Sequence, residues 1–359
     1  ILIDPSDGNI IYVGAMGDPF TINEHRGLYK SIDGGQNWKR ILFTNKLSGI
    51  ADLVMDPSNS NKLFAAVYQH KRTPYSFVSG GPGSGLFLSE DGGESWKKIG
   101  NKEGFPKGDL GRIGVAIAQS NPDIVYAKVE AEKNLLYRSD NGGASWSVIN
   151  SNPKFTNNRP FYFQDLAVDT QDENRLYNIY QPLSVSYDGG KTFDTTPMIP
   201  ADETKGIHAD FHAIWINPND PQHFIIGGDG GLGITQDHGK SWYFPETIPV
   251  AQFYHINVDY DTPFNVYGGM QDNGNWSGPA YTWKRGGIRT LYWQYLVGGD
   301  GFYISPDKEN SRFGYGTSQN GDLYRYDKLT GYYQSIAPQP ISIKKNLRFN
   351  WNAGFARDP

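Results

Sequence analysis

The chain has 359 residues, a formal net charge of −5 and an isoelectric point near 5.8, so no basic surface for nucleic acid is expected. It contains no Cys, which excludes disulfides, thiolate catalysis and Cys-ligated metal sites. No run of 18 apolar residues appears, so the sequence predicts no transmembrane segment in this chain.

One motif recurs five times, and each copy is called a box below. A box has Ser or Thr first, Asp or Asn third, Gly fifth and an aromatic residue eighth. The five boxes are 31–38, 89–96, 139–146, 186–193 and 235–242. Their closing aromatic residues are 58, 50, 47 and 49 residues apart. A period of this size is typical of a repeat architecture.

Each box predicts a tight hairpin, because its glycines adopt positive φ angles without steric cost. The carboxylate of a box Asp is expected to accept backbone N–H groups of its own turn. Asn141 replaces Asp in the third box, and an amide oxygen can accept the same hydrogen bonds. This substitution favours a structural role for the box carboxylates over a catalytic one.

Two apolar strands precede each box, which gives four short strands in each repeat. Repeats of this kind predict an all-β fold, a β-propeller with seven four-stranded blades forming a single domain over 1–359. The predicted blades are about 1–48, 49–105, 106–152, 155–200, 205–248, 250–295 and 296–343, and 344–359 is a closing strand or the start of a next blade. The chain starts without Met and in mid-strand. Two expectations therefore stay open: a ring of seven blades, and a longer protein with further domains.

The box pattern resembles the Asp box, or BNR repeat, of sialidases, xyloglucanase-type glycoside hydrolases and sortilin receptors, which are all propellers. The segments 208–212 and 267–274 are similar to large bacterial BNR proteins described as sortilin-like or glycosyl-hydrolase-like. The resemblance implies a glycan-directed propeller, glycoside-hydrolase-like or carbohydrate-binding, with a polysaccharide ligand, no cofactor and an extracellular or periplasmic location. The alternative is a non-catalytic sortilin-like scaffold that binds a protein or peptide.

These families differ in motifs that can be compared with this chain. The Arg-Ile-Pro motif of sialidases is absent, and 112–114 (Arg-Ile-Gly) is the nearest string. The Cys-rich module of sortilins is also absent, since there is no Cys. Xyloglucanases use two Asp residues, and the surroundings of one of them loosely resemble 224–233, which makes Asp229 a candidate; no second residue could be matched.

Three carboxylates in the later blades are the candidate catalytic residues: Asp229, Asp272 and Asp300. Each follows an apolar strand that ends in a Gly-Gly pair or close to one, and we expect equivalent places in three successive blades. Carboxylates that converge separate their pKa values, so one can act as an acid and another as a base. A pair about 6.5–9.5 Å apart would suit inverting glycoside hydrolysis. The alternative is that Gly-Gly-Asp only forms a turn.

A second group of candidates is polar. His208, Asp210 and His212 alternate, so on an extended segment they would share one face. His255 is expected at the same level of the next blade. We expect these four residues to bind a ligand without a metal ion. The alternatives are a divalent-metal site and a purely structural cluster.

The third group lies in a long connection with two adjacent glycines. Its candidate ligand-binding residues are Trp283, Arg285, Arg289 and Trp293. Long loops on a rigid scaffold often carry function, and aromatic faces with Arg side chains suit sugar rings and their hydroxyls. The alternative is that these aromatic residues belong to the core, because Trp276 resembles the closing residue of a box.

Overall fold

The computed structural model describes the chain except for 158, 195–207, 246–247, 249, 341–346 and 358–359. Its residues form two compact units. The first unit contains Ile1–Gly228 and Leu232–Tyr243, and the second contains Asp229–Gly231 and Phe244–Pro359. Among the described residues, no helix is both long and apolar enough to span a membrane.

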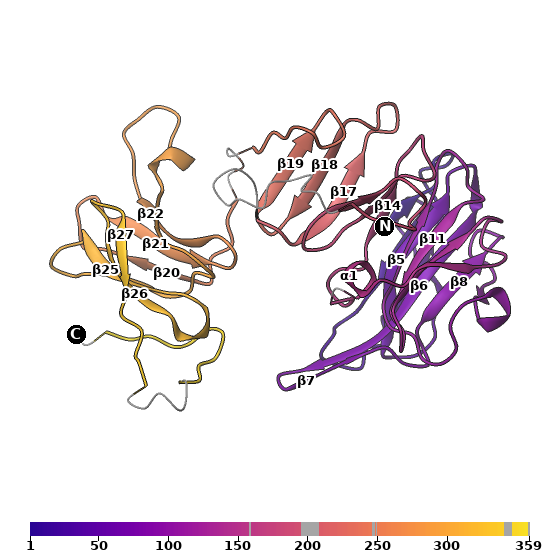
Figure 1. Ribbon diagram of the computed structural model, residues 1–359, viewed down its shortest axis with the longest axis horizontal. Helices are drawn as coiled ribbons and strands as arrows, with labels where there is room; N and C mark the ends of the chain where they lie inside the picture. Colours follow the sequence, from indigo (N-terminus) through magenta and orange to yellow (C-terminus); the bar gives the residue numbers. More distant parts are fainter. Residues whose placement is uncertain (158, 195–207, 246–247, 249, 341–346, 358–359) are drawn as a thin grey trace. The chain divides into compact units, whose positions relative to one another are not determined.

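The first unit contains five antiparallel sheets in which neighbouring strands follow chain order (Figure 1). The first sheet has β1 (Leu2–Ile3), β2 (Ile11–Ala15), β3 (Gly27–Ser31) and β4 (Lys39–Leu42). The second has β5 (Ser48–Asp56), β6 (Asn59–Thr73), β8 (Gly85–Ser89) and β9 (Lys97–Lys98), and β7 (Ser76–Ser79) pairs with the end of β6. The third has β10 (Ile113–Ile117), β11 (Val125–Val129), β12 (Leu135–Ser139) and β13 (Ser147–Asn150). The next two have β14 (Leu166–Val168), β15 (Leu176–Asn178) and β16 (Ser184–Ser186), and β17 (Phe211–Ile216), β18 (Phe224–Gly228) and β19 (Gly231–Thr235).

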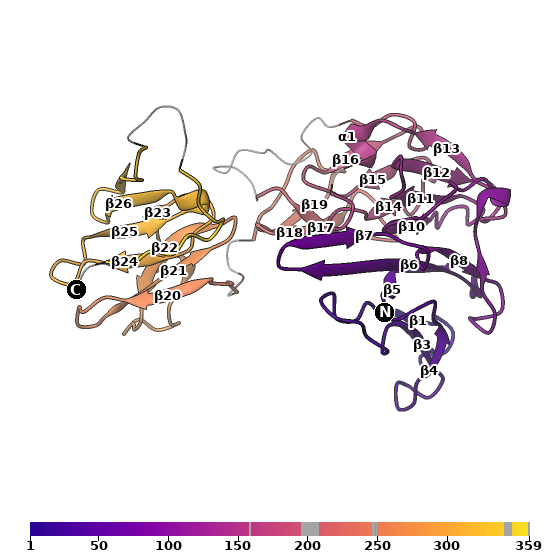
Figure 2. The ribbon, with the colours of Figure 1, turned by 90° about the horizontal axis from the view of Figure 1, so that it is seen from below.

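The second unit contains two four-stranded sheets that pack against each other (Figure 2). The first has β20 (His255–Val258), β21 (Asn265–Met270), β22 (Gly274–Pro279) and β23 (Gln294–Val297). The other has β24 (Ile304–Pro306), β25 (Phe313–Thr317), β26 (Leu323–Asp327) and β27 (Tyr332–Ser335). The shared core consists of Tyr267, Leu296, Val297, Ile304 and Tyr326.

Helical structure is sparse in the described residues. It consists of α1 (Pro153–Thr156) and the 3-10 turns η1 (Asn101–Glu103), η2 (Thr290–Tyr292) and η3 (Gln319–Gly321). One antiparallel sheet occupies each of the seven predicted blades, and the predicted all-β class with seven propeller-type sheets is confirmed. Two sheets have three strands plus a single bridge in the fourth position, Val185 to Asp194 and Ile234 to Tyr243. That all seven belong to one domain stays a prediction.

The boxes lie where the repeat predicts, on the hairpins that follow the third strand of the first five sheets. In the second box, the Ser89 hydroxyl donates to Asp91 Oδ1 at 2.8 Å, and the Ser95 N–H donates to the same oxygen at 2.9 Å. The indole of Trp96 closes the turn by donating to the Gly93 carbonyl at 3.1 Å. Asn141 Oδ1 makes the corresponding bonds in the third box, as expected for an amide.

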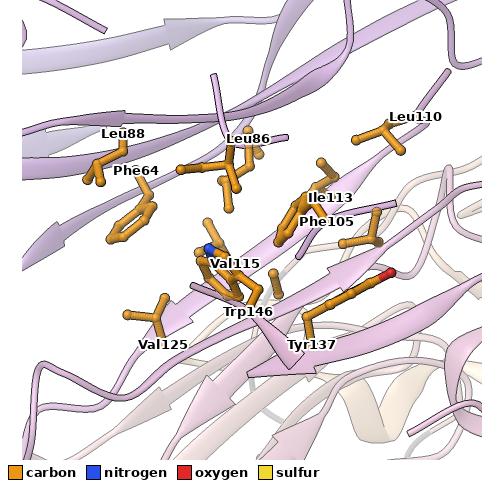
Figure 3. Packing of buried hydrophobic residues seen from close by; sticks show 14 residues of the cluster. Phe64, Leu86, Leu88, Phe105, Leu110, Ile113, Val115, Val125, Tyr137 and Trp146 are labelled. Carbon is orange, nitrogen blue, oxygen red and sulfur yellow. The ribbon is translucent and has the colours of Figure 1, made fainter. Parts of the chain in front are cut away.

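The closing aromatic residue of the third box packs against the preceding sheet in the core of the first unit. Trp146, from the third box, packs edge-on against Phe64 of β6, with ring centroids 6.3 Å apart, and against Phe105, with ring centroids 5.0 Å apart (Figure 3). These rings are buried together with aliphatic side chains of β8, β10 and β11. The third box therefore also packs its sheet on the preceding one.

Candidate functional site

The three candidate carboxylates all belong to the second unit. Asp229 follows β18 and Asp272 lies just beyond β21, each after the second strand of its sheet. Asp300 follows β23, which is the fourth strand of the sheet that also contains β21. The expectation that Asp300 occupies the same place in a successive blade is therefore wrong. In an antiparallel sheet the second and fourth strands end at the same edge, so Asp272 and Asp300 are still brought together.

Hydrogen bonds connect the surroundings of the three carboxylates. The Asp272 N–H donates to Asp300 Oδ1 at 3.1 Å, and the Asp300 N–H donates to Gln319 Oε1 at 2.8 Å. The Asn273 side-chain amide donates to the Asp229 carbonyl at 3.1 Å. Asp300 is only 7% exposed, whereas Asp272 is partly exposed and Asp229 is exposed. Within the described residues, Oδ2 of Asp300 is buried without a hydrogen-bond partner.

Glycines explain why the segment around Asp300 can approach the hairpin of β21 and β22. A Cβ at Gly301 would lie 2.3 Å from the carbonyl oxygen of Gly274, and one at Gly269 would lie 2.4 Å from the carbonyl carbon of Gly301. The Gly301 N–H donates to the Met270 carbonyl at 2.8 Å. The glycines next to Asp300 are thus required by the turn, as in the alternative interpretation of Gly-Gly-Asp. The catalytic role of the carboxylates stays a prediction.

A pocket of about 370 Å³ lies in the first unit and a larger one of about 730 Å³ lies in the second. The lining of the larger pocket is mainly apolar and aromatic: Ile248, Val250, Ala251, Phe253, Met270, Trp276, Ile288, Arg289, Thr290, Leu291 and Trp293. The rings of Phe253 and Trp293 stack with their centroids 6.0 Å apart. Phe253 lies over Gly268 and Trp293 over Gly278, and a Cβ at either glycine would collide with the ring above it. Met270 and Trp276 flank the turn that carries Asp272, so the pocket and this carboxylate share one hairpin.

The long connection between β22 and β23, drawn in orange in Figure 1, supplies part of this pocket. Of its predicted residues, Arg289 and Trp293 line the pocket. Trp283 is 88% exposed and meets the ring of Tyr281 at 4.8 Å, and neither Trp283 nor Arg285 lines the pocket. The connection stands where a box would stand, because it joins the third and fourth strands of its sheet.

Trp276 does resemble the closing residue of a box in its local bonding. Its indole donates to the carbonyl three residues earlier, that of Asn273, at 2.6 Å, as the indole of Trp96 does to Gly93. Its hairpin, however, joins the second and third strands, whereas every box follows a third strand. Trp276 therefore makes the hydrogen bond of a box indole, but at the opposite end of the sheet, where it lines a pocket.

The polar group of His208, Asp210 and His212 lies in the first unit and does not share one face. Asp210 has a φ of +69°, which interrupts the extended backbone that the alternation required. His208 Nδ1 lies 3.9 Å from Asp210 Oδ2, whereas the His212 ring stacks on Phe163 at 5.1 Å. The expected single face is therefore wrong, and the ligand-binding role of these residues stays a prediction.

His255, the fourth member of this predicted group, lies in the second unit. Its ring stacks on Tyr303 at 3.8 Å, and its Nε2 is 3.3 Å from the Asn352 side-chain amide. The stacking partner belongs to the same unit and fixes the plane of the imidazole. A role for His255 in ligand binding also stays a prediction.

Sequence reasoning missed a polar network in the first unit. Arg112 donates to the carbonyl groups of Phe161 and Tyr162 at 2.9 and 3.1 Å, and its guanidinium lies 3.4 Å from Asp165. Glu130 accepts the Arg112 N–H at 2.7 Å. Glu130 follows β11, the second strand of the third sheet, so it corresponds in position to Asp229. A carboxylate after a second strand was the feature that could have identified it.

Two charged groups near this network have shifted pKa values: the carboxyl group of half-buried Asp52 and the ammonium group of buried Lys128. Burial raises the pKa of Asp52 to about 6, against the lowering effect of the hydrogen bond from the Val115 N–H, and nearby Asp165 raises it further. Burial lowers the pKa of Lys128 to about 7. The Lys128 ammonium donates to Asn178 Oδ1 at 2.8 Å and to the Phe163 carbonyl at 3.1 Å.

Comparisons with known proteins find similarity to enzymes named xyloglucanases. One from Paenibacillus sp. is 27% identical over 218 residues, which are 54% of this chain and 20% of that protein. One from Hypocrea jecorina is 23% identical over 260 residues, 67% of this chain and 24% of that protein. The chain thus spans about a fifth to a quarter of the length of these curated relatives. No family model matches. Among solved structures, an ancestral GH74 enzyme aligns with a TM-score of 0.48 and 16% identity, over 93% of this chain and 45% of that chain.

Proposed function

We propose that the chain is part of a glycan-directed, glycoside-hydrolase-like protein whose site lies at the hairpin of β21 and β22. The observation that carries this proposal is the pocket of about 730 Å³ beside Asp272, lined by Trp276 and Trp293. Aromatic rings offer flat apolar faces to the C–H groups of a sugar ring. The similarity to enzymes named xyloglucanases supports xyloglucan as the first polysaccharide to test.

The two neighbouring carboxylates would have different roles. Asp272 is partly exposed on a turn next to the pocket and would be the group that meets the substrate. Asp300 is buried and accepts the Asp272 N–H, so it would hold that turn in place. Arg289 is the charged residue of the pocket lining and would donate hydrogen bonds to sugar hydroxyls.

A non-catalytic binding scaffold is the second candidate. It is favoured by the lining itself, because apolar side chains outnumber polar ones and would also accept apolar residues of a peptide. The two candidates differ in what the full chain should bind and convert. A glycan-directed site needs hydroxyl groups on its ligand, whereas a peptide scaffold would be insensitive to soluble glycans.

Two arginines of the same connection allow a matched test of the proposal. Arg289 lines the pocket and Arg285, four residues earlier, does not. In calorimetric titrations of the full chain with xyloglucan oligosaccharides, Arg289→Ala should weaken binding by about tenfold, the loss of a hydrogen bond to a charged group. Arg285→Ala should bind as the unaltered chain does. Equal affinities for both variants, or no binding of any glycan by the unaltered chain, would contradict the proposal, and competition by peptides alone would favour the scaffold.

A further inference from the structure

The smaller pocket lies in the first unit and shares no residue with the pocket beside Asp272. Its volume is about 370 Å³. One wall is the connection between β11 and β12, and the other is α1 with the residues around it. The lining is Glu130, Ala131, Glu132, Lys133, Asn134, Ser151, Pro153, Thr156, Asn157 and Pro160. Most of these side chains are polar, in contrast to the apolar lining of the larger pocket.

Hydrogen bonds hold the two walls in a defined arrangement. Asn134 Oδ1 accepts the Ala131 N–H at 3.0 Å, which closes the turn of the first wall. The Asn134 amide nitrogen donates to Asn157 Oδ1 at 2.9 Å and so bridges the two walls. Asn152 accepts the Lys154 N–H at 3.1 Å and caps α1. A ligand would therefore meet a preformed pocket.

Glu130 is positioned by two hydrogen bonds that use only one of its oxygens. Its Oε2 accepts from the Arg112 N–H at 2.7 Å and from the Ser79 hydroxyl at 2.8 Å. In the part of the chain that the structure describes, Oε1 makes no hydrogen bond. One carboxylate oxygen is thus available at a wall of the pocket, on a side chain whose orientation is already fixed.

The remaining polar groups suit hydroxyl-bearing ligands. Glu132 and Lys133 are exposed, and neither forms an ion pair within the described residues. The pocket therefore offers carboxylate acceptors, an ammonium donor and amide groups that do both, which matches the donor and acceptor character of sugar hydroxyls. With two carboxylates and one ammonium, the lining carries a formal excess of one negative charge, which disfavours acidic sugars.

Aromatic rings continue from the pocket along the chain. Pro160 lines the pocket, and the next residue, Phe161, contacts Phe77 at 4.9 Å and Tyr162 at 4.4 Å. Phe77 and Tyr162 are 38% and 41% exposed. Phe77 lies on β7, whose hairpin with β6 is the long purple extension in Figure 1. Rings of this kind give a platform for the sugar that follows one bound in the pocket.

We propose that this pocket is a second saccharide-binding site, which holds one neutral sugar unit against Glu130 while the rest of the oligosaccharide extends over Phe77 and Tyr162. The site would bind the polysaccharide without reacting with it. It lies in the other unit from Asp272, so either site can fail independently of the other.

The test is a calorimetric titration of the full chain with xyloglucan oligosaccharides and, separately, with oligogalacturonates. A chain with Asp272→Asn and Arg289→Ala should keep one class of binding for the neutral oligosaccharides. On that background, Glu130→Gln should weaken the binding by about tenfold, and Ala131→Trp, which fills the pocket, should abolish it. Glu90→Gln, on an exposed residue outside the pocket, is the matched control and should have no effect.

Melting temperatures would show whether each variant folds. Unchanged affinity in folded Ala131→Trp overturns the proposal, as does tighter binding of oligogalacturonates than of neutral oligosaccharides. The proposal is also overturned if the chain with Asp272→Asn and Arg289→Ala binds no neutral oligosaccharide. If the unaltered chain binds neutral oligosaccharides only at the pocket of the first unit, that result would count against the function proposed above. It would not count against the second saccharide-binding site.

Discussion

The backbone N–H of Asp272 donates to the carboxylate of Asp300 at 3.1 Å, although 28 residues separate them in the chain. The bond joins the turn after the second strand of a sheet to the segment after its fourth strand. Asp272 has a φ of +62°, a left-handed conformation that is uncommon for a non-glycine residue, and the Asp300 acceptor stabilises it. One carboxylate thus shapes the backbone that presents the other.

This relationship predicts effects of unequal size for two substitutions. Asp300→Ala removes a buried acceptor and leaves the Asp272 N–H without it, so the free energy of unfolding should fall by about 1–3 kcal/mol. Asp272→Ala keeps the backbone N–H and should change stability much less. Urea denaturation of both variants would measure this. Equal losses of stability would show that the Asp272 side chain, too, is structural.

The box carboxylates should contribute to stability and not to binding. Hydrogen bonds from the Ser95 hydroxyl and N–H and from the Ser89 hydroxyl lower the pKa of Asp91 to about 2. Asp91→Ala should lower the melting temperature by about 2–4 °C, and Glu90→Ala, next to it and exposed, should not. Glycan binding should be the same in both variants. An unchanged melting temperature with lost binding would contradict the structural role.

Asp52 should make the first unit less stable as the pH rises from about 4 to about 6. Its pKa is raised from 3.8 to about 6, so over this range the folded state binds more protons than the unfolded state. The free energy of unfolding therefore decreases with rising pH, and Asp52→Asn should remove that decrease. Chemical denaturation at several pH values would test it. The same pH dependence in the variant would show that other groups are responsible.

Lys128 should have the opposite pH dependence at alkaline pH. Its pKa is lowered from 10.5 to about 7, so between these values the unfolded state binds more protons. The free energy of unfolding should rise with pH across this range, and Lys128→Met should flatten the rise. The comparison uses denaturation curves at pH 7 and pH 9. A variant that keeps the full rise would mean that the Lys128 ammonium stays charged in the fold.

The repeat predicted the sheets well because each box encodes its own turn. The hydrogen bonds of Ser89, Asp91 and Trp96 are local, so their spacing in the sequence was enough to place the hairpin. Asp300 was misplaced because Gly-Gly-Asp is also local, and only the pairing of β23 with β22 assigns it to the sheet of Asp272. The positive φ of Asp210 likewise has no marker in the alternating pattern.

The pockets depend on contacts that the sequence does not display. The aromatic pocket needs Gly268 and Gly278 beneath Phe253 and Trp293, and these four residues come from four different segments of the chain. The composition of the long connection predicted Arg289 as a ligand-binding residue. It could not show that Arg289 lines the pocket and Arg285 does not. The place of Glu130 after a second strand is visible in the sequence, but its hydrogen bonds with Arg112 and Ser79 are not, because those residues are distant in the chain.

We propose above that Asp272 meets the glycan, and its carboxylate should therefore take part in glycan turnover. The most direct measurement is the release of reducing ends from xyloglucan by the full chain, compared between Asp272→Asn and Glu309→Gln, an exposed carboxylate of the same unit. We expect turnover by the unaltered chain, a loss of at least about 100-fold in Asp272→Asn and full activity in Glu309→Gln. Turnover that survives in folded Asp272→Asn, or no turnover by the unaltered chain, would contradict the claim.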